Sequence, residues 1–158
     1  MAVLTRLEKL LEDQRVPYEV HVHPAAYTAA GIAHADHVPE TEMAKVVILL
    51  SRGDLLMVTL PASRAIDLPR MAQLLGDPDV RLAREEEFAE RFGDCELGAM
   101  PPFGKLFGMP QWAEDTLGRE AETAFSAGTH HETIHMAFRD FARLSGAQFG
   151  SFGKRPTH

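Results

Sequence analysis

The stretch Val46-Val47-Ile48-Leu49-Leu50, followed by Leu55-Leu56-Met57-Val58-Thr59-Leu60, decides the fold of this chain. Both runs are apolar and rich in residues that favour strands, and the connection between them contains Gly53. A short glycine-containing connection between two such runs predicts a β-hairpin. Because both faces of each strand are apolar, we expect the hairpin to lie centrally in a sheet that helices cover.

Helices and further extended segments are expected on both sides of this hairpin. Leucines recur at helical spacing over residues 4–11, and Thr28 and Asp67 are placed to cap helices over 29–37 and 68–75. The other expected elements are extended segments at 18–22, 80–83, 121–125 and 133–136 and helices at 84–92 and 138–144. The segment 93–110 is expected to be a long loop, and the tail from 146 is expected to fray. This order predicts an α/β, α+β-like fold with a mixed sheet rather than a doubly wound parallel one.

The composition indicates an ordinary globular protein. Of the 158 residues, 45% are hydrophobic and 25% are charged, and no apolar stretch approaches the length of a membrane span. The N-terminal residues mix acids with leucines and do not resemble a secretory signal. Cys95 is the single cysteine, which excludes an internal disulfide and fits a reducing compartment. We therefore expect residues 1–158 to form one cytoplasmic domain.

The net charge of −7 argues against a protein that coats nucleic acid without specificity, because neutralising phosphates needs an excess of Lys and Arg. A small enzyme that meets only the end of an RNA needs no more than a local basic patch. Residues that could form such a patch are Arg52, Arg64, Arg70, Lys105, Lys154 and Arg155. A scatter of this kind is more often ordinary solvated surface.

Lys45 stands directly before the first apolar run. A lysine at the mouth of a buried strand either extends to solvent or presents its ammonium group to a pocket. The second reading gains weight from the loop Gly98-Ala99-Met100-Pro101-Pro102-Phe103-Gly104. Glycine allows close approach of the backbone and prolines stiffen it, so amide groups could point at the oxygen of an ester carbonyl as it gains negative charge. Taken alone, this loop could equally be a rigid surface turn.

Together these residues resemble the YbaK/EbsC family, also known as the prolyl-tRNA-synthetase-associated editing domain. The resemblance covers nearly the whole chain in order. It rests on His23-Pro24-Ala25-Ala26-Tyr27-Thr28, Ala44-Lys45-Val46-Val47-Ile48-Leu49, Pro61 with Ala62 and Arg64, Asp67-Leu68, Val80-Arg81-Leu82-Ala83, Gly98 to Gly104, and Phe125-Ser126-Ala127-Gly128-Thr129-His130.

The resemblance implies a mixed, strongly curved sheet that closes partly into a barrel with helices around it. It also implies a hydrolase that removes a wrong, small amino acid from a mischarged tRNA at the acceptor end, acting in trans. The expected partners are that tRNA and an aminoacyl-tRNA synthetase, with no DNA and no membrane. No cofactor, no metal ion and no protein nucleophile are expected, because water would attack the ester.

The family's functional residues carry over position by position. Its required lysine corresponds to Lys45, which would anchor or polarise the substrate end. Its glycine-proline loop corresponds to the stretch from Gly98 through Ala99 and Met100 to Pro101 and Pro102, whose amides would hold the ester carbonyl. The residues expected to line the pocket are Tyr27, Thr28, Met43, Pro102, Ser126, Gly128 and His130.

Val46 departs from two branches of this family. The alanine-specific branch carries asparagine after the lysine, and the cysteine-specific branch usually carries threonine. The sequence therefore assigns neither substrate.

Other kinds of site find less support. Eight histidines invite a zinc hypothesis, but the sequence has no CxxC or HExxH pattern with converging ligands. Cys95 lies between Asp94 and Glu96, whose negative charges would disfavour a reactive thiolate. The main alternative is a non-catalytic binding module that recognises an aminoacyl-tRNA end or an amino acid. Loss of turnover in a Lys45→Ala variant would separate the enzyme from the module, which has no turnover to lose.

Overall fold

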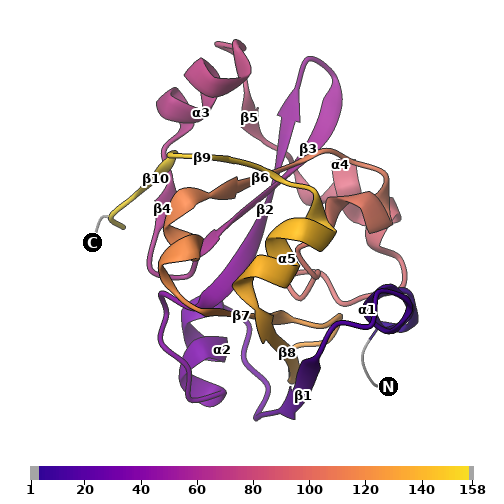
Figure 1. Cartoon of the computed structure of the whole chain (residues 1–158). Coiled ribbons are helices and arrows are strands. Elements are labelled where there is room, and N and C mark those ends of the chain that lie inside the picture. The colour runs from indigo at the N-terminus through magenta and orange to yellow at the C-terminus, as the bar shows by residue number, and fades with distance from the viewer. Residues whose placement is uncertain (1–3, 157–158) are drawn as a thin grey trace.

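The structure is a computed structural model that describes residues 4–156. Its main feature is a mixed sheet of eight strands (Figure 1). Across the sheet the strands run β1 (Tyr18–Val22), β8 (Glu132–Ala137), β7 (Glu122–Ser126), β2 (Met43–Ser51), β3 (Asp54–Pro61), β6 (Gln111–Glu114) and β9 (Gln148–Gly150), with β5 (Arg81–Leu82) paired to β2. A separate two-stranded sheet joins β4 (Ala65–Ile66) to β10 (Gly153–Lys154).

The predicted hairpin is confirmed. Strands β2 and β3 pair antiparallel from Ala44 opposite Pro61 to Ser51 opposite Asp54, and both lie in the middle of the sheet. Three pairs of strands are parallel, β2 with β7, β3 with β6 and β6 with β9, so the predicted mixed sheet is also confirmed. Within residues 4–156, the outer strands β1 and β9 do not pair with each other, and the sheet is open.

Helices surround this sheet. They are α1 (Thr5–Asp13), α2 (Ala29–Ala35), α3 (Leu68–Leu75), α4 (Glu85–Phe88) and α5 (Phe138–Ser145), with 3-10 helices η1 (Ala89–Phe92), η2 (Gly104–Phe107) and η3 (Asp115–Arg119). Figure 1 shows α3 toward the tip of the β2–β3 hairpin and α2 toward its other end. The expected caps are present, because the side chains of Thr28 and Asp67 accept hydrogen bonds from the backbone of Gly31 and Arg70. No helix in the described part of the chain is long and apolar enough to cross a membrane.

The alternation of side chains along the strands explains why the core has separate compartments. The largest compartment lies under α1 and α5, where the rings of Phe125 and Phe141 lie 5.5 and 5.6 Å from that of Phe103. A second packs α3 against residues of β2 and β3 that include Leu49 and Val58. The third joins α2 to Met43, Ala62 and Ala124. This last compartment fixes α2 beside the first residues of β2.

Two local predictions were wrong, and several elements were not predicted. The tail does not fray, because it supplies β9 and β10 and buries Phe152 completely. The loop predicted over 93–110 is present, but it contains η2 and is followed directly by β6 and η3, which the sequence did not predict. The acidic segment 84–92 is not one helix but a single α-helical turn, α4, continued by the 3-10 helix η1.

Candidate functional site

A pocket of about 160 Å³, here called the lysine pocket, opens beside the first residues of β2. Its walls come from α2, from β2, from the loop before η2 and from the end of β7. The lining residues are Ala29, Ile32, Met43, Ala44, Lys45, Val46, Gly98, Met100 and Ser126. The structure thus brings Lys45 together with the glycine-proline loop, although the two are distant in the sequence.

Lys45 enters the pocket from the strand. It shares a face of β2 with Met43, and the β2–β7 register, with Met43 beside Ala124, puts Lys45 next to Ser126. Burial lowers the pKa of the Lys45 ammonium group, and the charge of Glu40 opposes this only in part. Within residues 4–156, Lys45 forms no ion pair. The pocket therefore contains a half-buried cation that an electron-rich ligand group could satisfy.

The glycine-proline loop contains two amide groups without a hydrogen-bond partner among residues 4–156. The amide of Ala99 already donates to the carbonyl of Glu96 at 3.0 Å, and Pro101 and Pro102 have no N–H. The amides of Gly98 and Met100 donate to no other residue among 4–156. Both residues line the lysine pocket, so they are the candidate donors to a ligand oxygen.

A buried glutamine holds this loop against the sheet. The side-chain amide of Gln111, on β6, donates to the carbonyl of Pro102 at 2.7 Å and to the hydroxyl of Thr59 at 2.9 Å. Its oxygen accepts from the amide of Gly104 at 2.8 Å. Pro102 therefore anchors the loop and does not line the pocket.

His130 closes the other side of the loop. Its backbone amide and its Nδ1 atom both contact Oε1 of Glu96, at 2.7 and 2.9 Å, and these bonds lower the pKa of the Glu96 carboxyl. With Glu96 ionised, Nδ1 is the protonated nitrogen, which leaves Nε2 of His130 directed at Gly98. The ring of Tyr27 lies 4.8 Å from that of His130, although Tyr27 is 73% exposed.

Two of the remaining residues expected at the site have structural positions, and two line the pocket. Thr28 caps α2, and Gly128 donates its amide to the carbonyl of Ala99. Met43 and Ser126 do line the pocket. Ala29 and Ile32 of α2 form a wall of the pocket and Glu96 contacts His130, and neither role was predicted from the sequence. Their only signals were the alanine-rich segment after Thr28 and the acid close before Gly98.

A histidine–aspartate cluster lies on the face of the sheet that carries Met43 and Lys45. Asp36, just after α2, accepts from Thr133 at 2.7 Å and contacts His135 Nε2 at 2.6 Å and His21 Nδ1 at 3.3 Å. The two imidazole rings stack with 3.9 Å between centroids. Burial works to raise the pKa of Asp36, but the bonds from Thr133 and His135 lower it overall. His21, Asp36 and His135 have the donor types and spacing that a zinc ion accepts, and they also fasten α2 to β8.

Cys95 is not an activated nucleophile. Burial and then the charge of Asp94 raise the pKa of its thiol to about 11. At neutral pH the sulfur is therefore protonated and unreactive.

Comparisons with known proteins identify the family to which this chain belongs. The family model described as the aminoacyl-tRNA editing domain matches residues 23–144, more than half of the chain. A proline–tRNA ligase from Thermosipho africanus (strain TCF52B) is 26% identical over 106 residues, which cover 58% of this chain and 19% of the ligase. This chain thus corresponds to about a fifth of that protein.

Solved structures share the fold. A candidate trans-editing enzyme for prolyl-tRNA synthetase superposes with a TM-score of 0.81 at 23% identity and covers 94% of this chain and 95% of its own. The hypothetical protein APE2540 gives a TM-score of 0.84 at 22% identity over 94% of this chain and 99% of its own. The length of the matched segment, which includes Lys45 and the glycine-proline loop, shows that the chain belongs to the aminoacyl-tRNA editing domain family.

Proposed function

We propose that this chain is an aminoacyl-tRNA deacylase that removes a wrongly attached small amino acid from a tRNA in trans. The observation that supports this most directly is that Lys45, Gly98 and Met100 line one cavity, and that the Lys45 ammonium and the two amides have no partner among residues 4–156. A cation and two fixed amide donors are the groups that stabilise an ester carbonyl as it becomes an oxyanion.

The reaction follows from these groups. A water molecule, oriented by the substrate's ribose hydroxyl or by backbone groups, attacks the ester carbonyl carbon and loses a proton. The carbonyl oxygen becomes negative and accepts hydrogen bonds from Gly98 and Met100. The bond from the carbonyl carbon to the ribose oxygen then breaks, and that oxygen takes up the proton. The products are a free amino acid and a tRNA with a free terminal hydroxyl, and catalysis depends on positioning and electrostatics alone.

In this proposal Lys45 anchors the substrate end. Its ammonium group would bind an oxygen of the terminal adenosine or the ester and hold the carbonyl against the two amides. Because Lys45 is half-buried, this contact would be stronger than the same contact in bulk water.

The walls of the pocket favour a small, largely apolar amino-acid side chain. The cavity measures about 160 Å³, and its apolar lining residues are Ala29, Ile32, Met43, Ala44, Val46 and Met100. A single methylene in such a pocket changes the free energy of binding by about 1–3 kcal/mol, so several small amino acids would be accepted at different rates.

A deacylation assay tests the proposal. The purified chain is incubated with tRNAs charged with alanine, serine, threonine, cysteine, proline and small non-protein amino acids, and the release of each amino acid is measured. We expect release of one or a few of them by the wild-type protein and none by a folded Lys45→Ala variant. No release from any of these tRNAs by folded wild-type protein would contradict the proposal and favour a binding module. The proposed partners are the mischarged tRNA and a synthetase that charges it, which would place the enzyme in the cytoplasm.

A further inference from the structure

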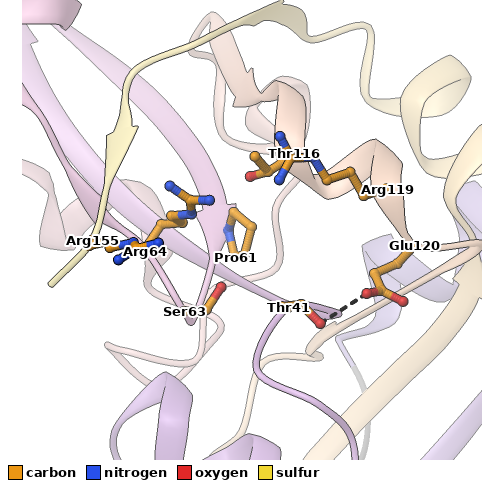
Figure 2. Close-up of a pocket in the computed structure, with 8 residues that line it drawn as sticks. All are labelled: Thr41, Pro61, Ser63, Arg64, Thr116, Arg119, Glu120 and Arg155. Carbon is orange, nitrogen blue, oxygen red and sulfur yellow. Dashed lines mark hydrogen bonds between the residues drawn. The ribbon is translucent and has the colours of Figure 1, made fainter.

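A second, larger cavity of about 270 Å³, here called the arginine pocket, lies where β3 ends and η3 begins (Figure 2). It is lined by Thr41, Pro61, Ser63, Arg64, Thr116, Arg119, Glu120 and Arg155. Figure 2 shows Arg64 and Arg155 on one side of Pro61 and the guanidinium group of Arg119 beside Thr116 on the other. Three segments far apart in the sequence therefore each bring one arginine to this cavity.

The three guanidinium groups are not neutralised. Among residues 4–156, Arg64, Arg119 and Arg155 form no ion pair, whereas Arg6 and Arg81 each hold a carboxylate at 2.7–2.8 Å. One acid lines the cavity, Glu120, and it accepts a hydrogen bond from Thr41 at 3.0 Å. In a chain of net charge −7, three unpaired arginines at one cavity are a marked local excess of positive charge.

Hydroxyl groups complete the donor set. The Thr116 hydroxyl oxygen is buried and has no hydrogen-bond partner among the described residues. A buried hydroxyl without a partner costs free energy, so it marks a position where a ligand acceptor would be satisfied. Ser63 adds a second hydroxyl, and Figure 2 shows it beside Arg64. Guanidinium groups together with hydroxyl donors are the chemistry that binds phosphate oxygens.

The arginine pocket adjoins the lysine pocket. Pro61, which lines the arginine pocket, pairs directly across β2 and β3 with Ala44, which lines the lysine pocket. Thr41, on the rim of the arginine pocket, comes two residues before Met43 of the lysine pocket. A polymer that carries phosphates could therefore reach both cavities at once.

We propose that the arginine pocket binds a phosphate group, and that during editing this phosphate belongs to the tRNA whose terminal adenosine occupies the lysine pocket. The second part rests on the proposed function, and the first part does not. Arg119 and Arg155 are exposed, so the site is accessible to the backbone of a large RNA as well as to a free phosphate.

Binding of uncharged tRNA provides the test, because it requires no hydrolysis. The variants are Arg64→Gln, Arg119→Gln, Arg155→Gln and the triple combination, with Arg15→Gln as control, since Arg15 is exposed and lines no part of the arginine pocket. Fluorescence anisotropy gives the Kd for tRNA over a range of salt concentrations. We expect each single variant to weaken binding several-fold, the triple variant to reduce the slope of log K against log salt by about 1, and the control to change neither.

A Thr116→Val variant separates phosphate binding from a structural role. Removing an unpartnered hydroxyl should leave the Tm unchanged or raise it, while the affinity for phosphate falls. In a second arm, calorimetry measures the binding of inorganic pyrophosphate to the wild-type protein and to the triple variant.

These arms distinguish the possible sources of the phosphate. Weaker tRNA binding by the arginine variants supports the tRNA backbone as the ligand. Unchanged tRNA binding together with loss of pyrophosphate binding supports a phosphate site for a small molecule and removes the link to editing. If folded variants bind both ligands as the wild type does, the arginine pocket is not a phosphate site. These binding measurements do not depend on hydrolysis. If the deacylation assay detects no activity, they still show whether the arginine pocket binds tRNA, pyrophosphate or neither, so the two proposals can fail separately.

Discussion

Gly98 faces the imidazole of His130 so closely that a β-carbon at position 98 would lie 3.1 Å from its Nε2 atom. Gly98 also has a φ of +89°, which residues with a β-carbon rarely adopt. The positive φ and the lack of room for a β-carbon both favour glycine at position 98, beside the lysine pocket.

Gly98→Ala should impair both stability and activity. The positive φ costs about 1–2 kcal/mol of unfolding free energy, and displacement of the amides should lower the deacylation rate about 10²-fold. Gly53→Ala is the matched control, because Gly53 has a similar φ of +83° but no atom near its would-be β-carbon. The control should lose a similar amount of stability in a denaturant titration and keep full activity. Equal rates for both variants would show that the loop geometry does not matter.

The lysine pocket could be anticipated only in part from the sequence. Lys45 is recognisable because it precedes a continuous apolar run, and the glycine-proline loop is recognisable from its composition. Their meeting at one cavity could not be read from spacing, because it depends on pairing between distant strands. The resemblance to a known family supplied that expectation.

The errors have physical causes. Strands β6 and β9 pair in parallel with strands far away in the sequence, and no local turn announces them. The tail was expected to fray because Gly146, Gly150 and Gly153 suggested flexibility. In the structure, Oε2 of Glu114 accepts hydrogen bonds from the backbone amides of Phe152 and Gly153 at 2.7 and 2.6 Å, and these bonds hold the tail in place.

Gln111→Ala should destabilise the protein by about 2–3 kcal/mol, because it leaves the Pro102 carbonyl, the Gly104 amide and the Thr59 hydroxyl buried without a partner. The loop should also lose its anchor, so the deacylation rate should fall. Gln73→Ala, at an exposed position of α3, should change the unfolding free energy by no more than about 0.5 kcal/mol. Chemical denaturation of both variants measures the difference. A Gln111 variant as stable as the Gln73 variant would refute this role.

Asp36→Asn should lower the unfolding free energy at pH 7 by about 2 kcal/mol, because it weakens charge-assisted hydrogen bonds to Thr133 and His135. The pKa of Asp36 is lowered in the folded protein, so this stabilisation is present above its ordinary value of 3.8 and is lost as the pH falls through the folded pKa. The stability gap between wild type and variant should therefore narrow below pH 4. A gap that is constant from pH 7 to pH 2.5 would contradict the assignment.

The deacylation rate should decline at a pH below the one at which an ordinary lysine loses its proton. Burial lowers the pKa of Lys45 below 10.5, and the neutral amine cannot anchor an electron-rich group. The same shift makes the unfolding free energy rise as the pH increases through the folded pKa, because the unfolded chain then binds more protons. In Lys45→Arg the guanidinium group stays charged, so whatever activity remains should lack this decline. The measurement is the deacylation rate of the wild type and of Lys45→Arg at each pH, corrected for spontaneous ester hydrolysis. If both proteins show the same decline at alkaline pH, Lys45 is not the titrating group.

Lys45 is proposed to act in catalysis rather than in folding. The most direct test of this role is single-turnover deacylation of the preferred charged tRNA by the wild-type protein and by Lys45→Ala, with Lys9→Ala as an exposed control on α1. The Kd for tRNA and the Tm are measured on the same samples. We predict a rate constant about 10²- to 10³-fold lower in Lys45→Ala, with a Tm close to wild type and a tRNA Kd that rises far less than the rate falls, and no change in Lys9→Ala. A Lys45→Ala variant that deacylates at the wild-type rate would contradict the account.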